Sequence, residues 1–255
     1  PALLPLCNRD GLGMTVVAVC MMRNEEDVAG YVVRHMLAEC DRVIVADNRS
    51  TDATLAVLAD IETGDLVVVD EPRFAYSQTD TMNRLAAMAP DADWIVPFDA
   101  DEWWDSAGGR IADVLMALDA DATTTRTWDM VPQPDDPPDP NPFSRIMHYR
   151  PGSLWSRPTY GKVAFRPGPG RRIQQGNHGL TGETQPPVGP LRLRHVPFRS
   201  FEQARRKVRH GREVLLAAGM PPTEGFHWQT WGAYGDDQLR EWWADWTRPE
   251  GLATW

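Results

Sequence analysis

Two aspartates, Asp99 and Asp101, directly follow the short apolar run at residues 94–98. Side chains two positions apart on an extended segment project to the same side, so both carboxylates could point to one place beyond the end of a strand. Magnesium and manganese are often held by one or two carboxylates together with substrate phosphates. The pair therefore predicts a site for a divalent cation and a diphosphate. An isolated Asp-x-Asp is more often an acidic surface turn, so the surrounding elements must decide between these interpretations.

The first hundred residues alternate strand-like and helix-like segments. Apolar, β-branched runs predict strands at residues 15–20, 42–46, 66–69 and 94–98, and amphipathic segments predict helices at 28–38, from a cap at Ser50 or Thr51 to 61, and at 78–88. This order indicates an α/β fold with a mostly parallel sheet flanked by helices, which binds ligands beyond the carboxyl ends of its strands. Polar clusters at Arg23, Asp47 and Asp99 all fall at that edge. Their recurrence favours a binding site over a surface turn.

The pattern beyond residue 106 is less regular. Helices are predicted at residues 111–118, 201–218 and about 237–246, and strands at 123–130 and 162–165. The proline-rich segment 132–142 predicts an exposed extended loop.

The composition of the 255 residues is that of an ordinary globular protein, with 42% hydrophobic and 24% charged residues. A net charge of −10 argues against nucleic acid as a partner, because phosphate contacts need an excess of lysine and arginine. Three cysteines without a CxxC pair, together with the lack of a leader or an apolar span, lead us to expect a cytoplasmic protein without an integral membrane segment. Lys162 and Lys207 are the only lysines, which we attribute to genome composition rather than to function.

Three motifs in this order strongly resemble the family 2 glycosyltransferases, which have the nucleotide-sugar-binding fold called GT-A. They are Arg-Asn-Glu-Glu at 23–26, Asp-Asn-Arg-Ser-Thr-Asp at 47–52 and Asp-Ala-Asp-Glu at 99–102. The segments 195–200 and 176–178 are similar to the C-terminal part of one branch of that family. The resemblance implies a catalytic domain over residues 1–200, with a donor half at about 15–104 and an acceptor half at about 105–200. A helical extension would cover 201–255.

The resemblance also implies a donor site. Val19, Met21 and Arg23 would line the nucleoside pocket, and Asp47 would accept a hydrogen bond from the imino N–H of uracil or thymine. The other residues implied to contact the donor are Glu26 at the mouth of the pocket, Arg84 near the diphosphate, Asp99 at the ribose or the metal, Ala100 in the same turn, and Arg199 from the basic run 192–212.

For the metal, the resemblance implies Asp101 as a direct ligand, Asp99 as a shared one, and His195 as a further ligand from the C-terminal segment. Imidazole suits Mn²⁺ better than Mg²⁺. A histidine that only packs at the start of a helix is an equal alternative for His195.

Family 2 enzymes typically invert by single displacement, so the resemblance implies a base on the acceptor side. His178, Glu183 and Glu102 are the candidates, and we favour His178 because its unperturbed pKa of about 6.5 suits neutral pH.

The expected function is metal-dependent transfer of a sugar from a UDP- or TDP-sugar to a hydroxyl of a small-molecule or glycan acceptor, and an oligomer is possible. Two alternatives stay open: a nucleotidyltransferase acting on a sugar phosphate, and a non-catalytic nucleotide-binding module on the same fold. A nucleotidyltransferase usually has a glycine-rich loop after its first strand, where this chain has residues 21–24 without glycine. A SAM-dependent methyltransferase is disfavoured by the same lack of glycine.

Overall fold

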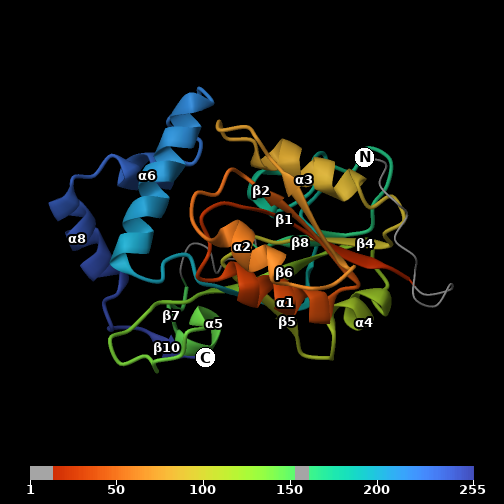
Figure 1. Cartoon of the computed structure of the whole chain (residues 1–255). Coiled ribbons are helices and arrows are strands. Elements are labelled where there is room, and N and C mark those ends of the chain that lie inside the picture. Colours follow the sequence, from red (N-terminus) through yellow and green to blue (C-terminus); the bar gives the residue numbers. More distant parts are fainter. Residues whose placement is uncertain (1–13, 153–160) are drawn as a thin grey trace.

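An eight-stranded mixed sheet lies at the centre of the fold in the residues that the structure, a computed structural model, describes: 14–152 and 161–255 (Figure 1). The strand order is β3-β2-β1-β4-β8-β6-β9-β5. The pairings among β1, β2, β3 and β4 are parallel, as is β6 with β9, and the other three pairings are antiparallel. The α/β fold class predicted from the sequence is confirmed.

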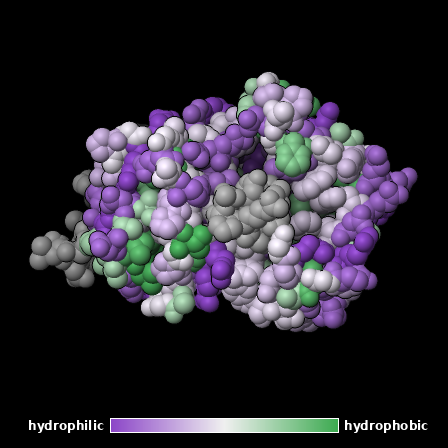
Figure 2. Space-filling view, turned by 180° about the vertical axis from the view of Figure 1, so that it is seen from behind, coloured by the Kyte–Doolittle hydropathy of each residue, from purple (hydrophilic) through white to green (hydrophobic). Residues whose placement is uncertain are grey.

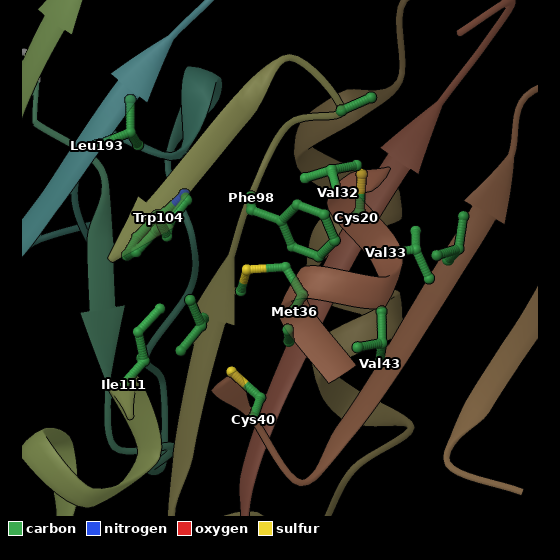
Figure 3. Close-up of a cluster of buried hydrophobic side chains, with 14 of the residues drawn as sticks. Cys20, Val32, Val33, Met36, Cys40, Val43, Phe98, Trp104, Ile111 and Leu193 are labelled. Carbon is green, nitrogen blue, oxygen red and sulfur yellow. The ribbon is translucent and has the colours of Figure 1, made fainter. Parts of the chain in front are cut away.

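The first half of the chain follows the predicted alternation of strands and helices. Its elements are β1 (Val16–Met22), α1 (Ala29–Glu39), β2 (Arg42–Asp47), α2 (Thr54–Ala59), β3 (Leu66–Asp70), α3 (Gln78–Ala87) and β4 (Trp94–Pro97). Alternate residues of β1 pack on opposite faces of the sheet. Cys20 packs with α1 and with Phe98 in one buried cluster (Figure 3), and Val19 packs with α3 in the other. Burial on both faces explains why β1 is an uninterrupted apolar run.

The helix α2 begins at Thr54, so the predicted cap at Ser50 or Thr51 was wrong. Ser50 and Thr51 instead connect two loops, because the Asn24 backbone N–H donates to the Ser50 hydroxyl and the Thr51 N–H donates to the Asn24 side chain. Asp52 accepts a hydrogen bond from the Thr54 N–H at 3.0 Å. These contacts hold the loops after β1 and β2 side by side.

Two of the longer strands in the second half, β5 and β9, were not predicted from the sequence patterns. β5 (Glu102–Ser106) starts inside the acidic motif and pairs with β9 (Val188–His195), with Glu102 opposite His195. β9 also pairs with β6 (Ala122–Asp129), with Asp129 opposite His195. These two pairings bring His195 beside the acidic turn.

The remaining elements are short or lie near the C-terminus. They are α4 (Ile111–Met116), α5 (Pro142–Arg145), β7 (His148–Tyr149), β8 (Val163–Phe165), the 3₁₀ turn η3 (Gln175–Asn177), α6 (Phe201–Ala217), α7 (Phe226–Gly232), α8 (Asp236–Trp246) and β10 (Ala253–Thr254). The proline-rich segment is an irregular loop up to α5, as predicted. Of these, α5, β7, η3, α7 and β10 were not predicted.

The helices α6 and α8 lie beside the sheet in Figure 1 and share a small aromatic core around Phe198. Four tryptophans meet the Phe198 ring edge to face, with ring centres 5.0–6.3 Å away. The Ser200 hydroxyl caps α6 by accepting from the Gln203 N–H. The face of the molecule that is turned away from the viewer in Figure 1 is covered mostly by hydrophilic side chains among its described residues (Figure 2). No helix in the described ranges is long and apolar enough to cross a membrane.

Candidate functional site

A cavity of about 610 Å³ lies at the carboxyl ends of β1 and β4 and is bounded on the other side by α6 and α7. This volume is within the range of small-molecule sites, roughly 300–1,000 Å³. Predicted site residues that line it are Met21, Arg23, Asp99, Ala100, Asp101, Glu102, His178 and His195. The sequence therefore located the cavity at the correct edge of the sheet.

The carboxylates of Asp99 and Asp101 do not share partners, so the expectation that they point to one place was wrong. Residues 99–102 form a turn, in which the Glu102 N–H donates to the Asp99 carbonyl at 3.1 Å, rather than an extended segment. Asp99 Oδ1 accepts from the side-chain amides of Gln78 and Asn177, at 3.0 and 3.1 Å. The argument from strand alternation fails because the strand β4 ends before the motif.

Lys162 completes the surroundings of Asp99. Its Nζ lies 2.6 Å from Asp99 Oδ2, 2.9 Å from Glu102 Oε1 and 2.8 Å from the Gly176 carbonyl oxygen. Burial alone would lower the pKa of Lys162, but the two carboxylates outweigh it and hold that pKa above its ordinary value. Both Asp99 oxygens are thus occupied by donors. Its predicted role at the ribose or the metal stays a prediction.

Glu102 is fully buried. Its Oε2 accepts from the Asp99 backbone N–H at 2.9 Å, which stabilises the turn. Burial raises the pKa of Glu102 to about 7, even though Lys162 opposes the rise. The Glu102 carboxylate is paired with Lys162 and bonded to the Asp99 N–H. Glu102 is therefore the one of the three base candidates that also stabilises the acidic turn.

Asp101 faces two cationic groups from distant segments. Its Oδ2 lies 2.5 Å from Lys207 Nζ and 3.5 Å from His195 Nε2. Burial opposes ionisation of Asp101, but Lys207 and His195 hold its pKa well below the usual range. His195 Nδ1 lies 2.9 Å from Asp129 Oδ1. Burial would lower the pKa of His195, yet the Asp101 and Asp129 carboxylates raise it to about 10.

The arrangement of His195 fits a metal ligand. Metal-bound histidines usually donate their second ring N–H to a carboxylate, as His195 Nδ1 can to Asp129, and the first nitrogen then faces the metal. No group of three or more His, Cys, Asp or Glu side chains in the described parts of the chain is arranged to hold a metal. Two protein ligands are sufficient for Mg²⁺ or Mn²⁺ when substrate phosphates and water supply the rest. Asp101 and His195 therefore fit a divalent cation that binds together with a diphosphate.

Arg23 and Asn48 line the end of the cavity where the sequence analysis expected a nucleoside pocket. Arg23 Nη1 donates to the Asn48 carbonyl at 2.8 Å, and its guanidinium lies 5.8 Å from the centre of the Phe74 ring. Asp47 is buried behind Asn48, where its Oδ2 accepts from the Ser50 N–H. Asp47 Oδ1 and Arg23 Nε are buried and have no hydrogen-bond partner among the described residues. An unsatisfied acceptor and an unsatisfied donor thus lie at this end.

Six predicted site residues do not line the cavity, and Asp47 is one of them. Val19 is in the core between the sheet and α3. The other four are engaged elsewhere: Glu26 accepts from the Ala53 N–H at 2.9 Å, Arg84 binds Glu71 at 2.9 Å, Glu183 accepts from Arg171 at 2.9 Å, and Arg199 pairs with Glu25 and Asp27 at 2.5 and 2.7 Å. The donor-side roles predicted for Glu26, Arg84 and Arg199, and the base role for Glu183, are not supported by these positions.

His178 follows η3, whose backbone is held to the acidic turn. Lys162 Nζ donates to the Gly176 carbonyl, and the Asn177 amide donates to Asp99. Gly176 has a φ of 71°, and a Cβ there would lie 2.7 Å from the His178 ring. A glycine is therefore required at this position for His178 to face the cavity in this conformation.

Sequence analysis missed the cavity residues of α6 and both lysines. Lys162 and Lys207 are the chain's only lysines, and both place Nζ on the acidic turn, so attributing them to genome composition overlooked their position. That the chain has only these two lysines was the one sequence feature that could have drawn attention to them. The cavity-lining residues of α6 include Gln203, Lys207, His210 and Val214. This helical spacing marks one face of α6, but the sequence does not indicate what that face meets.

The comparisons with known proteins concern the family and the fold. The model of the family described as "Glycosyl transferase family 2" matches residues 17–143. No curated protein sequence matches the chain.

Three solved structures are similar at low identity. They are S. aureus TarS 1–349 in complex with UDP (14% identity, 90% of this chain and 78% of that chain, TM-score 0.42), the mannosyltransferase PcManGT from Pyrobaculum calidifontis in complex with GDP-Man and Mn²⁺ (14%, 92% and 74%, 0.44), and glucosyl-3-phosphoglycerate synthase from Mycobacterium tuberculosis in complex with Mn²⁺, UDP and glucosyl-3-phosphoglycerate (16%, 85% and 88%, 0.42). Of a longer TarS chain, this chain covers 23%.

Proposed function

Because the chain belongs to glycosyl transferase family 2, we propose that it transfers a sugar from a nucleoside diphosphate sugar to an acceptor hydroxyl group in the cavity beyond β1 and β4. The observation that carries this proposal is the Asp101–His195–Asp129 chain of contacts in that cavity, where a diphosphate-bound cation fits. Asp47 Oδ1 and Arg23 Nε have no hydrogen-bond partner within the described part of the chain, and their proximity to this cavity supports the proposal that the donor carries a nucleoside which they could bind.

The departing diphosphate gains negative charge in the transition state, and a divalent cation on Asp101 and His195 would supply a Lewis acid there. Neighbouring residues of the chain hold these two proposed ligands in position. Asp129 fixes the orientation of His195, and Glu102 holds the backbone of the turn that carries Asp101. Imidazole as a ligand favours Mn²⁺ over Mg²⁺.

The donor's base is proposed to be uracil or thymine. The imide edge of these bases offers one N–H donor flanked by carbonyl acceptors, which complements Asp47 Oδ1 and Arg23 Nε. A pairing of this kind leaves both buried groups satisfied, whereas a base without an imino N–H leaves Asp47 unpaired at a cost of about 1–3 kcal/mol.

Calorimetry with UDP, TDP, GDP and CDP, each with and without Mn²⁺, tests the function. We expect UDP or TDP to bind more tightly than CDP by about tenfold or more, with Mn²⁺ strengthening the binding. In Asp47→Ala this preference should disappear. Asp52→Ala is the matched control, because Asp52 lies in the same loop but serves α2. The absence of binding by all four nucleotides would refute the transferase and favour a different role for this fold.

For the acceptor, we propose His178 as the base that removes the hydroxyl proton in a single displacement with inversion. His178→Ala should lower kcat by about 10²-fold or more and leave the affinity for the nucleotide unchanged, because general-base catalysis contributes about 10²–10⁴-fold. Glu183→Gln is the control, since its carboxylate is bound to Arg171 outside the cavity lining. An unchanged rate in His178→Ala would transfer the role to Glu102, and NMR of the product's anomeric proton tests inversion.

A further inference from the structure

The helix α6 presents two cations, Arg206 and Lys207, to the cavity. The cavity-lining stripe of α6 includes Arg206, Lys207, His210 and Val214, which lie on one side of the helix. Lys207 is the member of this stripe that reaches the acidic turn, where its Nζ contacts Asp101 Oδ2 at 2.5 Å. The cation on α6 thus lies at the same carboxylate that is proposed to face the diphosphate.

The two lysines of the chain are in different situations at this turn. The three N–H groups of an ammonium match three acceptors, and Lys162 has three within 2.9 Å in Asp99, Glu102 and Gly176. Lys207 has one acceptor at 2.5 Å, and its next carboxylate oxygen, Glu25 Oε1, is 3.8 Å away. The Lys207 side chain is 21% exposed and that of Lys162 is 10% exposed. Lys207 therefore keeps donor capacity at the cavity, and Lys162 does not.

Glu25 does not compete strongly for Lys207. Its carboxylate already binds the buried Arg199 at 2.5 Å, and Arg199 also pairs with Asp27. Asp101 in turn has a second neighbour in His195, whose Nε2 lies 3.5 Å from Asp101 Oδ2. Lys207 can consequently exchange its contact with Asp101 for one with an anion in the cavity, and Asp101 would keep the His195 ring beside it.

We propose that Lys207 is a direct ligand of the donor's diphosphate, an inference that rests on the proposed nucleotide-sugar site. Its ammonium exchanges Asp101 for a phosphate oxygen when the donor enters, which releases Asp101 and places a fixed positive charge at the leaving group. A charge-assisted hydrogen bond of this kind is worth about 10- to 100-fold in affinity. Lys162, with its donors occupied, has no such role.

The test compares the affinity for a nucleoside diphosphate with that for its nucleoside, in EDTA so that no cation contributes. We would titrate UDP and uridine, or TDP and thymidine if those bind more tightly, into wild-type protein and into Lys207→Met and Lys207→Gln. The ratio of the two affinities should fall about 10- to 100-fold in both variants, with nucleoside affinity unchanged. Lys207→Arg should retain part of the ratio. Circular dichroism checks that each variant is folded.

Arg205→Met is the matched control, because Arg205 precedes the stripe on α6 and pairs with Glu202 and Asp236 away from the cavity lining. It should keep the wild-type ratio. If the folded Lys207 variants also keep that ratio, the assignment of Lys207 is wrong while the proposed function stands. If wild-type protein binds neither the diphosphate nor the nucleoside, the proposed function fails first, and the inference falls with it.

Discussion

Asp101→Asn is expected to abolish sugar transfer, with kcat/KM at least about 10³-fold lower, because losing a preorganised group at the developing charge commonly costs 10²–10³-fold and here a metal ligand is lost as well. The amide has the shape of the carboxylate but carries no charge. It would leave His195 and Lys207 facing a neutral group and would weaken any cation at this place. Donor hydrolysis with Mn²⁺ measures the loss, since it requires no knowledge of the acceptor.

The control for this variant is Asp105→Asn. Asp105 lies on β5 in the same segment, but its carboxylate pairs with Arg192 at 2.5 Å and does not line the cavity. We expect near wild-type hydrolysis from Asp105→Asn, and Mn²⁺ binding in the presence of the nucleotide should be lost only in Asp101→Asn. Undiminished transfer by a folded Asp101→Asn protein would overturn the assignment of Asp101.

Lys162→Met is expected to lower the free energy of unfolding by about 3–5 kcal/mol, the usual cost of removing one partner of a buried ion pair. The variant leaves Asp99 Oδ2 and Glu102 Oε1 without their ammonium and the Gly176 carbonyl without a donor. Burial already raises the pKa of Glu102 to about 7 against the opposing effect of Lys162, so loss of the ammonium should favour protonated Glu102. Urea unfolding followed by tryptophan fluorescence measures the change.

The double variant Lys162→Met/Glu102→Gln separates charge from packing. It should recover part of the loss, since the uncompensated buried carboxylate is then neutral, and the double-mutant cycle gives the interaction energy of the pair. Arg172→Met serves as the surface control, because its nearest carboxylate oxygen is 4.0 Å away and its side chain is 59% exposed, and it should change stability by less than about 0.5 kcal/mol. A loss below about 1 kcal/mol in Lys162→Met would show that the ammonium does not stabilise this turn.

Local patterns were sufficient for the first half of the fold. The apolar run of β1 and the amphipathic pattern of α1 and α3 each depend on residues that are close in sequence, and the polar residues after β1, β2 and β4 must meet at one edge of a parallel sheet. The positions of Arg23 and Asp101 at the cavity followed from that rule alone. The rule failed for Val19, which lies within β1 rather than beyond its carboxyl end and is buried under α3.

Side-chain partners from distant segments could not be predicted in this way. His195 was placed at the metal by resemblance, but its contact with Asp129 depends on the pairing of β9 with β6, and its place beside Glu102 depends on the pairing of β9 with β5. Arg199 was expected at the donor, and only the fold shows that Glu25 and Asp27 hold it in the interior. Such pairings follow from how strands pack, which no short window of sequence contains.

The sequence by itself determined that an acidic turn lies at the ligand-binding edge of an α/β sheet, because strand and helix periodicity and the order of the motifs are local properties. Only the tertiary structure decided which groups each carboxylate of that turn contacts. Both line the cavity, but Asp99 accepts from Lys162 and two side-chain amides, whereas Asp101 contacts Lys207 and His195. The physical reason is that the charge state and direction of a buried carboxylate are set by counter-charges, and here these come from Lys162 just before β8, from β9 and from α6, far along the chain.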